Sequence, residues 1–176
     1  MVLEGKTALI TGGSSGIGLA AARALLDSGA RVAITGRSTE RLEKAAVELG
    51  GDVLPIDADV TSLTDLANMR TKLESAFGSL DIVFANAGVA MGTPLATTDE
   101  ATYHKIMDAN VKGVFFTVQA VLPLLQDGAS IILNTSWLNQ IGAPGRAILS
   151  ASKAAVRSFA RTMSAELLER RIRVNA

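Results

Sequence analysis

Short apolar runs of strand length alternate with helix-like segments along the whole chain. The runs are almost continuously apolar, as in strands that are buried on both faces of a sheet. Six runs fit this description: Thr7 to Thr11, Arg31 to Thr35, Asp52 to Ile56, Leu80 to Ala85, Ser130 to Asn134 and Ile172 to Asn175. Strands that alternate with helices predict βαβ units, and hence a parallel sheet with helices on both faces.

Helix start and stop signals lie between these runs. Apolar residues from Ile17 to Leu26 recur at helical spacing, and Gly29 follows at a typical C-terminal position. Capping residues predict further helices that start at Ser38 or Thr39, at Ser62 (with Asp65) and at Thr97 (with Glu100). We expect a fifth helix from about Ser150 to Glu169.

The connections between the strands limit the topology of the sheet. Right-handed crossovers favour a doubly wound α/β sheet in the order 3-2-1-4-5-6. Such a sheet binds its ligand in a crevice at the carboxyl ends of strands one and four. Because the 176 residues contain no linker or low-complexity segment, we expect a single domain over residues 1–176.

Composition excludes several classes of function. Basic residues (17) and acidic residues (17) balance, so no overall positive field would attract nucleic acid or anionic lipid. The chain has no cysteine and one histidine, His104, so we expect no disulfide and no metal site. It shows no secretory signal and no apolar stretch long enough to span a bilayer, so we expect a cytoplasmic protein without a membrane partner.

The glycine-rich segment TGGSSGIG, residues 11–18, follows the first strand and opens the first helix. Glycines let the backbone approach a ligand closely, while the helix N-terminus offers free N–H groups to a phosphate. A tight turn without a ligand would use similar residues, but the position after the first strand favours nucleotide binding. The residues expected to contact the nucleotide are Gly12, Ser14, Ser15, Gly16, Ile17 and Gly18.

The ends of strands two and three carry charged residues. An NAD site usually places an acidic side chain after strand two to hold the ribose 2′-hydroxyl, but this chain has Arg37. Arginine can pair with a 2′-phosphate, which favours NADP over NAD, although a solvated arginine at a helix start would look the same. After strand three, Asp59 could accept a hydrogen bond from the adenine amino group or cap nearby N–H groups; both readings stay open.

A compact turn, Asn86, Ala87 and Gly88, follows strand four. Its small residues would let a ligand lie across the sheet edge beside the glycine-rich turn. We therefore expect these three residues to line the nucleotide site.

Together these motifs resemble the short-chain dehydrogenases/reductases, which have the Rossmann fold, including 3-oxoacyl-ACP-reductase-like and glucose-dehydrogenase-like members. The resemblance covers the whole chain. It rests on TGGSSGIG, Asp59 with Val60, NAG at 86–88, Asn110 of DANVKG, Ser136 of ILNTS, PG at 144–145, SASK ending at Lys153, and the closing IRVNA.

The resemblance implies hydride transfer between a nicotinamide cofactor, NADP or NAD, and an alcohol or carbonyl substrate. In the family a serine orients the substrate oxygen, a lysine holds the nicotinamide ribose, and an asparagine holds a water in the proton relay. Ser136, Lys153 and Asn110 match these catalytic positions, while Asp59 and Val60 match a cofactor-binding motif. The family's long helices pair across two-fold axes, which implies a homodimer or homotetramer through residues near 101–125 and 150–169.

Two departures from the family pattern stand out. The catalytic tyrosine lies four residues before the lysine, and this chain has Leu149 there. Leucine cannot exchange a proton, so the chain could be an impaired oxidoreductase or a protein that binds the cofactor without catalysis; both hypotheses stay open. Family members also continue past the VNA segment, so the resemblance implies that their C-terminal part is missing from these 176 residues.

Overall fold

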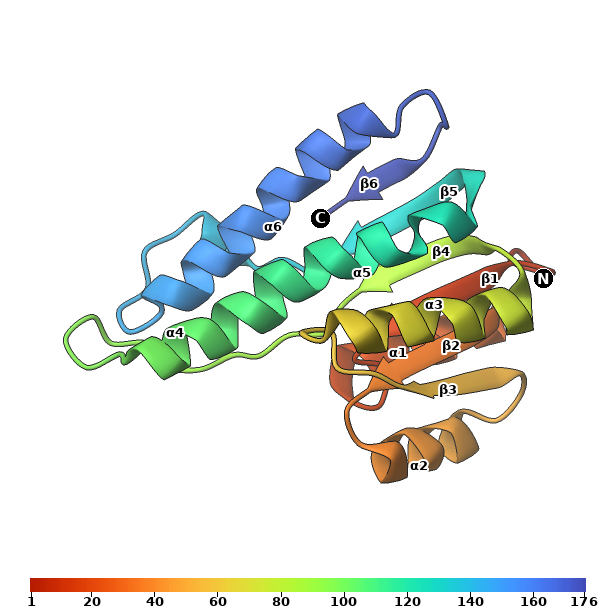
Figure 1. Ribbon diagram of the computed structural model, residues 1–176, viewed down its shortest axis with the longest axis horizontal. Helices are drawn as coiled ribbons and strands as arrows, with labels where there is room; N and C mark the ends of the chain where they lie inside the picture. The colour runs from red at the N-terminus through yellow and green to blue at the C-terminus, as the bar shows by residue number, and fades with distance from the viewer.

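A computed structural model describes all residues, 1–176, and contains one six-stranded parallel sheet. The strands lie in the order β3-β2-β1-β4-β5-β6, as predicted. Their bounds are Thr7–Thr11 (β1), Arg31–Gly36 (β2), Val53–Asp57 (β3), Leu80–Ala85 (β4), Leu125–Leu133 (β5) and Arg173–Asn175 (β6). The sheet forms the middle layer of the molecule (Figure 1).

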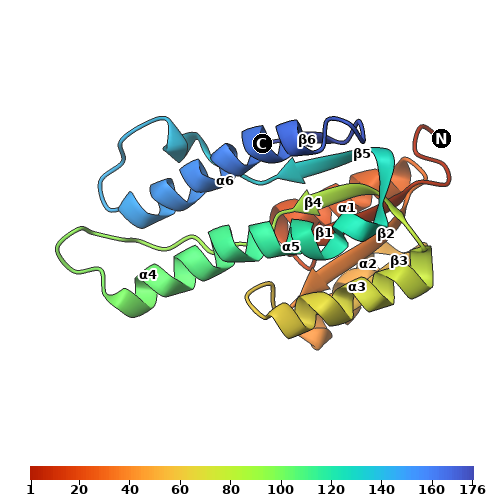
Figure 2. The same ribbon diagram turned by 45° about the horizontal axis from the view of Figure 1, so that its top comes forward.

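Helices cover the sheet on both faces (Figures 1 and 2). Their bounds are Gly16–Asp27 (α1), Thr39–Leu49 (α2), Leu63–Phe77 (α3), Glu100–Met107 (α4), Gly113–Val121 (α5) and Ala147–Glu166 (α6). The alternation of side chains along β1 explains the two layers: Ala8 and Ile10 belong to the core shared with α1 and α2, whereas Leu9 belongs to the larger core under α3, α5 and α6. None of the helices is long and apolar enough to cross a membrane.

The helix starts settle one open alternative and correct one expectation. Ser38, rather than Thr39, caps α2, because its Oγ accepts a hydrogen bond from the Arg41 backbone N–H at 3.3 Å. The expected start at Thr97 is wrong: Asp99 caps α4, with its Oδ1 accepting from the Thr102 N–H at 2.8 Å. A carboxylate competes well for this position because it also interacts favourably with the helix dipole.

The long helix expected near residues 101–125 is interrupted. Between α4 and α5 lies one π-helical turn, Asp108–Lys112, and a short 3-10 turn, Leu122–Leu124, follows α5. The interruption places Asn110 in the interior, fully buried, where it binds the loop after β4. Helix periodicity does not reveal such an insertion, because the apolar pattern continues through it.

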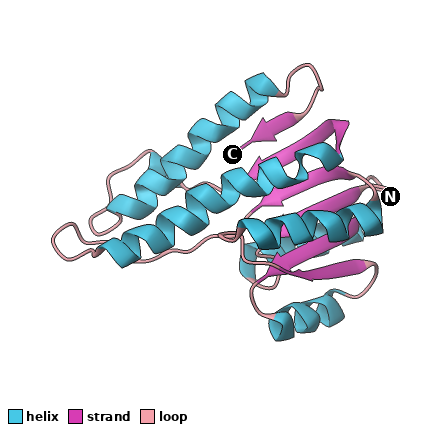
Figure 3. Cartoon of the chain, viewed as in Figure 1, coloured by secondary structure: helices cyan, strands magenta, loops and turns pink.

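Two segments begin earlier than the sequence predicts. Strand β5 begins at Leu125 rather than Ser130, and α6 spans Ala147–Glu166 rather than about 150–169. The connections that follow β4 and β5 both leave the same end of the sheet (Figure 3). They are held together by an isolated bridge between Thr93 and Arg146, with the Thr93 N–H donating to the Gly145 carbonyl at 2.7 Å.

Candidate active site

The glycine-rich turn joins β1 to α1 and leaves the start of the helix open for an anion. The N-cap, Ser15, makes no side-chain hydrogen bond to the first turn, which contains no acidic residue. Gly16 has φ +54°, a conformation that favours glycine. A Cβ on Gly18 would lie 2.2 Å from the Gly12 carbonyl oxygen, so this turn accepts only glycine there.

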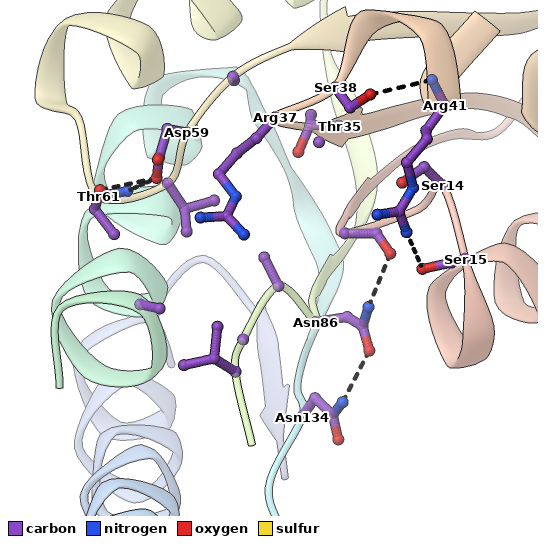
Figure 4. Close-up of a pocket in the computed structure, with 18 of the residues that line it drawn as sticks. Ser14, Ser15, Thr35, Arg37, Ser38, Arg41, Asp59, Thr61, Asn86 and Asn134 are labelled. Atoms are coloured by element: carbon purple, nitrogen blue, oxygen red, sulfur yellow. Dashed lines mark hydrogen bonds between the residues drawn. The ribbon is translucent and has the colours of Figure 1, made fainter. Parts of the chain in front are cut away.

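Asn86 fastens the glycine-rich turn to the end of β4. Its Nδ2 donates to the carbonyls of Thr11 at 3.0 Å and Gly12 at 3.3 Å, and its Oδ1 accepts from Asn134 Nδ2 at 2.8 Å (Figure 4). In return, Thr11 Oγ1 accepts from the N–H groups of Asn86 and Ala87, both at 3.0 Å. The carboxyl ends of β1, β4 and β5 are thereby held in one network.

A cleft of about 670 Å³ opens at these strand ends (Figure 4). It brings together ten residues that the sequence predicts for the nucleotide: Gly12, Ser14, Ser15, Ile17, Arg37, Asp59, Val60, Asn86, Ala87 and Gly88. Gly16 and Gly18 shape the turn but do not line the cleft. Sequence reasoning missed the cleft residues Thr35, Ser38, Arg41 and Asn134. Arg41 lies four residues after Arg37, but an arginine in the first turn of a helix does not by itself indicate a ligand site.

The structure confirms the capping reading of Asp59, and its contact with adenine stays a prediction. Its Oδ1 accepts from the backbone N–H and the hydroxyl of Thr61, at 2.9 and 2.8 Å, so it does cap its own loop. The residue also lines the cleft, and its Oδ2 forms no hydrogen bond. The Asp59 backbone N–H donates to Asp65 Oδ2 at 2.9 Å, which fixes the loop against the start of α3 and contributes to the lowered pKa of Asp65.

Lys153 lies on α6 and reaches the network at the end of β5. Its Nζ donates to the Asn134 carbonyl at 2.7 Å. Desolvation by burial lowers the pKa of this ammonium below its ordinary value of 10.5. Asn134 lines the cleft and donates to Asn86. The Lys153 ammonium therefore contacts a residue of the cleft wall without lining the cleft itself.

Ser136 lies between β5 and α6, and Leu149 lies in the first turn of α6. Ser136 caps the 3-10 turn Trp137–Asn139, and its Oγ accepts from the Leu138 N–H at 3.2 Å. Leu149 is buried, with 6% exposure, one helical turn before Lys153 on α6. Neither residue lines the nucleotide cleft. Tyr103, the chain's only tyrosine, is 42% exposed on α4 and does not line the cleft either.

Asn110, the residue predicted for the proton relay, is fully buried and hydrogen-bonded to protein through its side-chain amide. Its Oδ1 accepts from the Val89 N–H at 2.7 Å, and its Nδ2 donates to the Val89 carbonyl at 3.0 Å and to Ser152 Oγ at 3.1 Å. Both ends of the amide are therefore occupied by protein. In this structure Asn110 fastens the π-helical turn to the loop after β4 and to α6.

The cleft has the features of a dinucleotide site. Gly12 and Gly18 leave space where side chains would meet backbone. Thr35, fully buried at the floor of the cleft, has an Oγ1 without a hydrogen-bond partner. Buried hydroxyls normally have partners, and this one has none within the protein.

Comparison with known proteins agrees with this geometry. A family profile described as short chain dehydrogenase matches residues 6–176. The chain belongs to the short-chain dehydrogenases. It is 43% identical over 175 residues to the oxidoreductase asL5 of Sarocladium schorii, covering 98% of this chain and 70% of that protein. It is 36% identical over 181 residues to the 3-oxoacyl-[acyl-carrier-protein] reductase FabG of Thermotoga maritima, covering all of this chain and 74% of that protein.

Solved short-chain dehydrogenases have the same fold. A short chain dehydrogenase from Burkholderia cenocepacia J2315, solved in complex with NADP, matches with a TM-score of 0.94 and 33% identity. The match covers 99% of this chain and 74% of that one. The protein is thus an oxidoreductase of the NAD(P)-dependent dehydrogenase/reductase class with a Rossmann fold.

Proposed function

We propose that this short-chain dehydrogenase transfers a hydride between NADP(H) and a small alcohol or carbonyl substrate. The observation that carries the proposal is the network from Lys153 through Asn134 and Asn86 to the glycine-rich turn. This network connects a lysine suited to the nicotinamide ribose with a turn suited to the pyrophosphate. The position after β2, where an NAD site usually has an acidic residue, is Arg37 in this chain, and this supports NADP over NAD.

In this proposal, different residues bind the cofactor and position the substrate. The N-terminus of α1 and the turn before it hold phosphate, and Asp59 Oδ2 accepts from the adenine amino group. Lys153 donates to the ribose hydroxyls, and the Ser136 hydroxyl orients the substrate oxygen. The bound cofactor supplies or accepts the hydride. Because Leu149 cannot exchange a proton, a water, or Ser136 with Lys153, takes over that exchange at a reduced rate.

Direct titration tests this proposal. NADPH and NADH are titrated separately into the protein, and turnover is then assayed on the same sample with a broad panel of aldehydes and ketones. We expect NADPH to bind more tightly and carbonyl reduction to be slow but measurable. If neither dinucleotide binds, the proposed function is wrong; if NADPH binds but no carbonyl oxidises it, the catalytic part of the proposal is wrong.

We further propose that copies of this chain pair through α5 and α6. Phe115 on α5 is 36% exposed, and its ring centroid lies 5.6 Å from that of Phe159 on α6. Phe116 stacks edge-on to Phe115 at 5.2 Å. An aromatic group that joins two helices at a surface suits a helix-to-helix interface. Light scattering after size-exclusion chromatography should give a mass of two or four chains, and a mass of one chain would contradict this.

Cofactor affinity should depend on pH through Lys153. The ammonium donates hydrogen bonds below its pKa and loses one donor and its charge above it. Because burial lowers this pKa, NADPH affinity should fall as pH rises through a range below 10.5. Lys153→Met should weaken binding at neutral pH and flatten the profile, measured by fluorescence titration from pH 6 to 10. An unchanged profile in the variant would assign the titration to another group.

Thr35→Val should weaken binding of both dinucleotides. Valine keeps the shape of threonine but removes the unpaired hydroxyl at the floor of the cleft. Loss of one hydrogen bond to the ligand, direct or through a water, should raise both dissociation constants by about 2- to 10-fold. Calorimetric titration measures this, with Thr117→Val as the matched control, since Thr117 also has a buried, unpaired Oγ1 but lies outside the cleft. Equal affinities in wild type and Thr35→Val would exclude a role in binding.

A further inference from the structure

The segments that follow β4 and β5 contain few groups that can donate a proton. Residues 86–98 and 134–152 include no aspartate, glutamate, histidine or tyrosine. Both segments line part of the cleft, and the bridge between Thr93 and Arg146 joins them. Arg146, which is exposed, and the adjoining Lys153 are the cations of this region. The rest of the two segments consists of apolar and neutral polar residues.

Two hydrogen bonds fix the turn after β5 against α6. Ser150 Oγ, in the first turn of α6, donates to the Leu138 carbonyl at 2.5 Å. One turn further along the helix, Lys153 Nζ donates to the Asn134 carbonyl at 2.7 Å. Ser136 lies between Asn134 and Leu138 in the chain. The serine and the lysine that the proposed function assigns to substrate and cofactor are therefore held in one rigid unit.

Leu149 brings an apolar side chain into this unit. It precedes Ser150 directly, is 6% exposed, and lies outside both main cores of the protein. Because it is buried, it leaves no open channel to solvent at its position. A substrate held by Ser136 and Lys153 therefore meets a hydrocarbon side chain where a proton would have to be exchanged.

Hydride acceptors differ in their need for that proton. When hydride adds to a carbonyl carbon, the C=O π electrons move to oxygen and form a strongly basic alkoxide, so a general acid speeds the step. When hydride adds to an iminium carbon, the C=N π electrons become the lone pair of a neutral amine. The iminium reaction needs no proton from the protein, and Leu149 does not impair it.

Trp137 offers a surface that suits a cationic substrate. It is the chain's only tryptophan, is 67% exposed, and begins the 3-10 turn that Ser136 caps. An indole face attracts a cation through the quadrupole of the ring. Within the chain a cation lies over an aromatic ring at Arg31 and Phe77, so the indole of Trp137 carries no cation of the protein itself.

Two positive charges oppose a cation at this place, and neither is strong. Arg146 is exposed, so solvent and salt screen its charge. Lys153 is partly buried, and this desolvation lowers the pKa of its ammonium, which therefore gives up its proton more readily when a second cation binds. A neutral Lys153 amine still has N–H groups to donate to Asn134.

We propose that the preferred substrate of this protein is an iminium cation, which it reduces to an amine with NADPH, and that Trp137 binds the cation through its indole face. This inference rests on the proposed function, since it uses the same cofactor and the same hydride transfer, and it names a different acceptor. NADPH loses a hydride and becomes NADP⁺, the iminium carbon gains that hydride, and no proton is required.

The test compares three hydride acceptors under single-turnover conditions with saturating NADPH. The probes are N-methyl-dihydroisoquinolinium, which is a permanent iminium cation, α-tetralone, a ketone of similar size, and naphthoquinone, a neutral acceptor that also needs no strong acid. Each rate is divided by the rate of the same reaction without protein, which removes the intrinsic reactivity of the probe. We expect the acceleration of the iminium to exceed that of the ketone by about 100-fold or more.

Variants of Leu149 test the proton argument. Leu149→Tyr should accelerate the ketone and thereby lower the ratio of iminium to ketone acceleration by about 100-fold or more. Leu149→Phe, which adds the ring without the hydroxyl, should keep the ratio within about 3-fold of the wild type.

Variants of Trp137 test the cation argument. Trp137→Leu should raise the KM of the iminium by about 2- to 30-fold and leave the KM of the ketone within about 2-fold. Trp137→Phe, which keeps an aromatic face, should recover part of the loss. Ile141→Ala is the matched control, since Ile141 is an exposed apolar residue of the same loop without an aromatic ring. Thermal unfolding of each variant shows whether it is folded.

Several results would overturn the inference. It is wrong if the ketone or the quinone is accelerated as much as the iminium, or if a folded, NADPH-binding Leu149→Tyr leaves the ratio unchanged. Equal effects of Trp137→Leu on both KM values would reject the role of Trp137. Acceleration of the ketone above that of the iminium would leave the proposed function standing without this inference, whereas failure of both dinucleotides to bind would reject the proposed function itself.

Discussion

Leu149→Tyr should raise kcat for carbonyl reduction by about 100- to 10,000-fold, the range that a positioned general acid contributes. Residue 149 is one helical turn before Lys153 on α6 and thirteen residues after Ser136. A phenol at this position would lie on the face of the helix that carries Lys153, whose positive charge would lower the pKa of the phenol. The remaining groups proposed for binding are already in place, so NADPH affinity should change little.

Leu149→Phe is the matched control, because it adds the ring of tyrosine without its hydroxyl. The phenylalanine variant should show no gain in kcat, and the melting temperatures of both variants should be compared because residue 149 is buried. Single-turnover oxidation of NADPH with a reactive aldehyde measures the chemical step directly. If Leu149→Tyr folds, binds NADPH and is no faster than the wild type, the cleft serves cofactor binding without proton chemistry at this position.

Gly18→Ala should abolish measurable binding of both dinucleotides, with an increase in the dissociation constants of at least about 100-fold. The added Cβ would meet the Gly12 carbonyl oxygen at 2.2 Å and Asn86 Nδ2 at 2.7 Å. Since the nearest atom is backbone, relief requires the glycine-rich turn to move away from α1. We also expect a loss of stability of about 1–3 kcal/mol from the forced displacement.

Gly142→Ala is the control for a glycine substitution in general. Gly142 has no atom within 4 Å of an added Cβ and no positive φ, so alanine should be tolerated there. Calorimetric titration gives the affinities, and urea unfolding gives the stability of each variant. Wild-type NADPH affinity in Gly18→Ala would contradict the assignment of this turn to the pyrophosphate.

The sheet could be predicted because its strands are continuous apolar runs separated by helical patterns. All six strands and their order agree with the expectation, and β1 and β4 agree to the residue. The disagreements lie where local pattern and tertiary contact differ. The π-helical turn at Asp108–Lys112 depends on Asn110 bonding to Val89, a partner 21 residues away in the sequence. No periodicity within the helix encodes that contact.

The site was predictable to the extent that each motif directly follows a strand. TGGSSGIG, Arg37, Asp59 and Asn86 all reach one cleft because the carboxyl ends of parallel strands meet at one edge. Thr35 and Arg41 were missed because they are unremarkable in sequence, a threonine inside a strand and an arginine in an ordinary helix. Only the folded structure shows that the Thr35 hydroxyl has no hydrogen-bond partner and that the Arg41 side chain points toward Ser15.

The amino-acid sequence alone predicts the layers of the fold, the order of the strands and the position of the glycine-rich turn, and it shows the leucine at residue 149. These depend on local patterns and on residue identity. The tertiary structure decided which polar atoms are already occupied: both ends of the Asn110 amide bind protein, Lys153 donates to Asn134, and Thr35 has no partner. Hydrogen bonding between distant segments depends on atomic distance, and only the folded chain sets that distance.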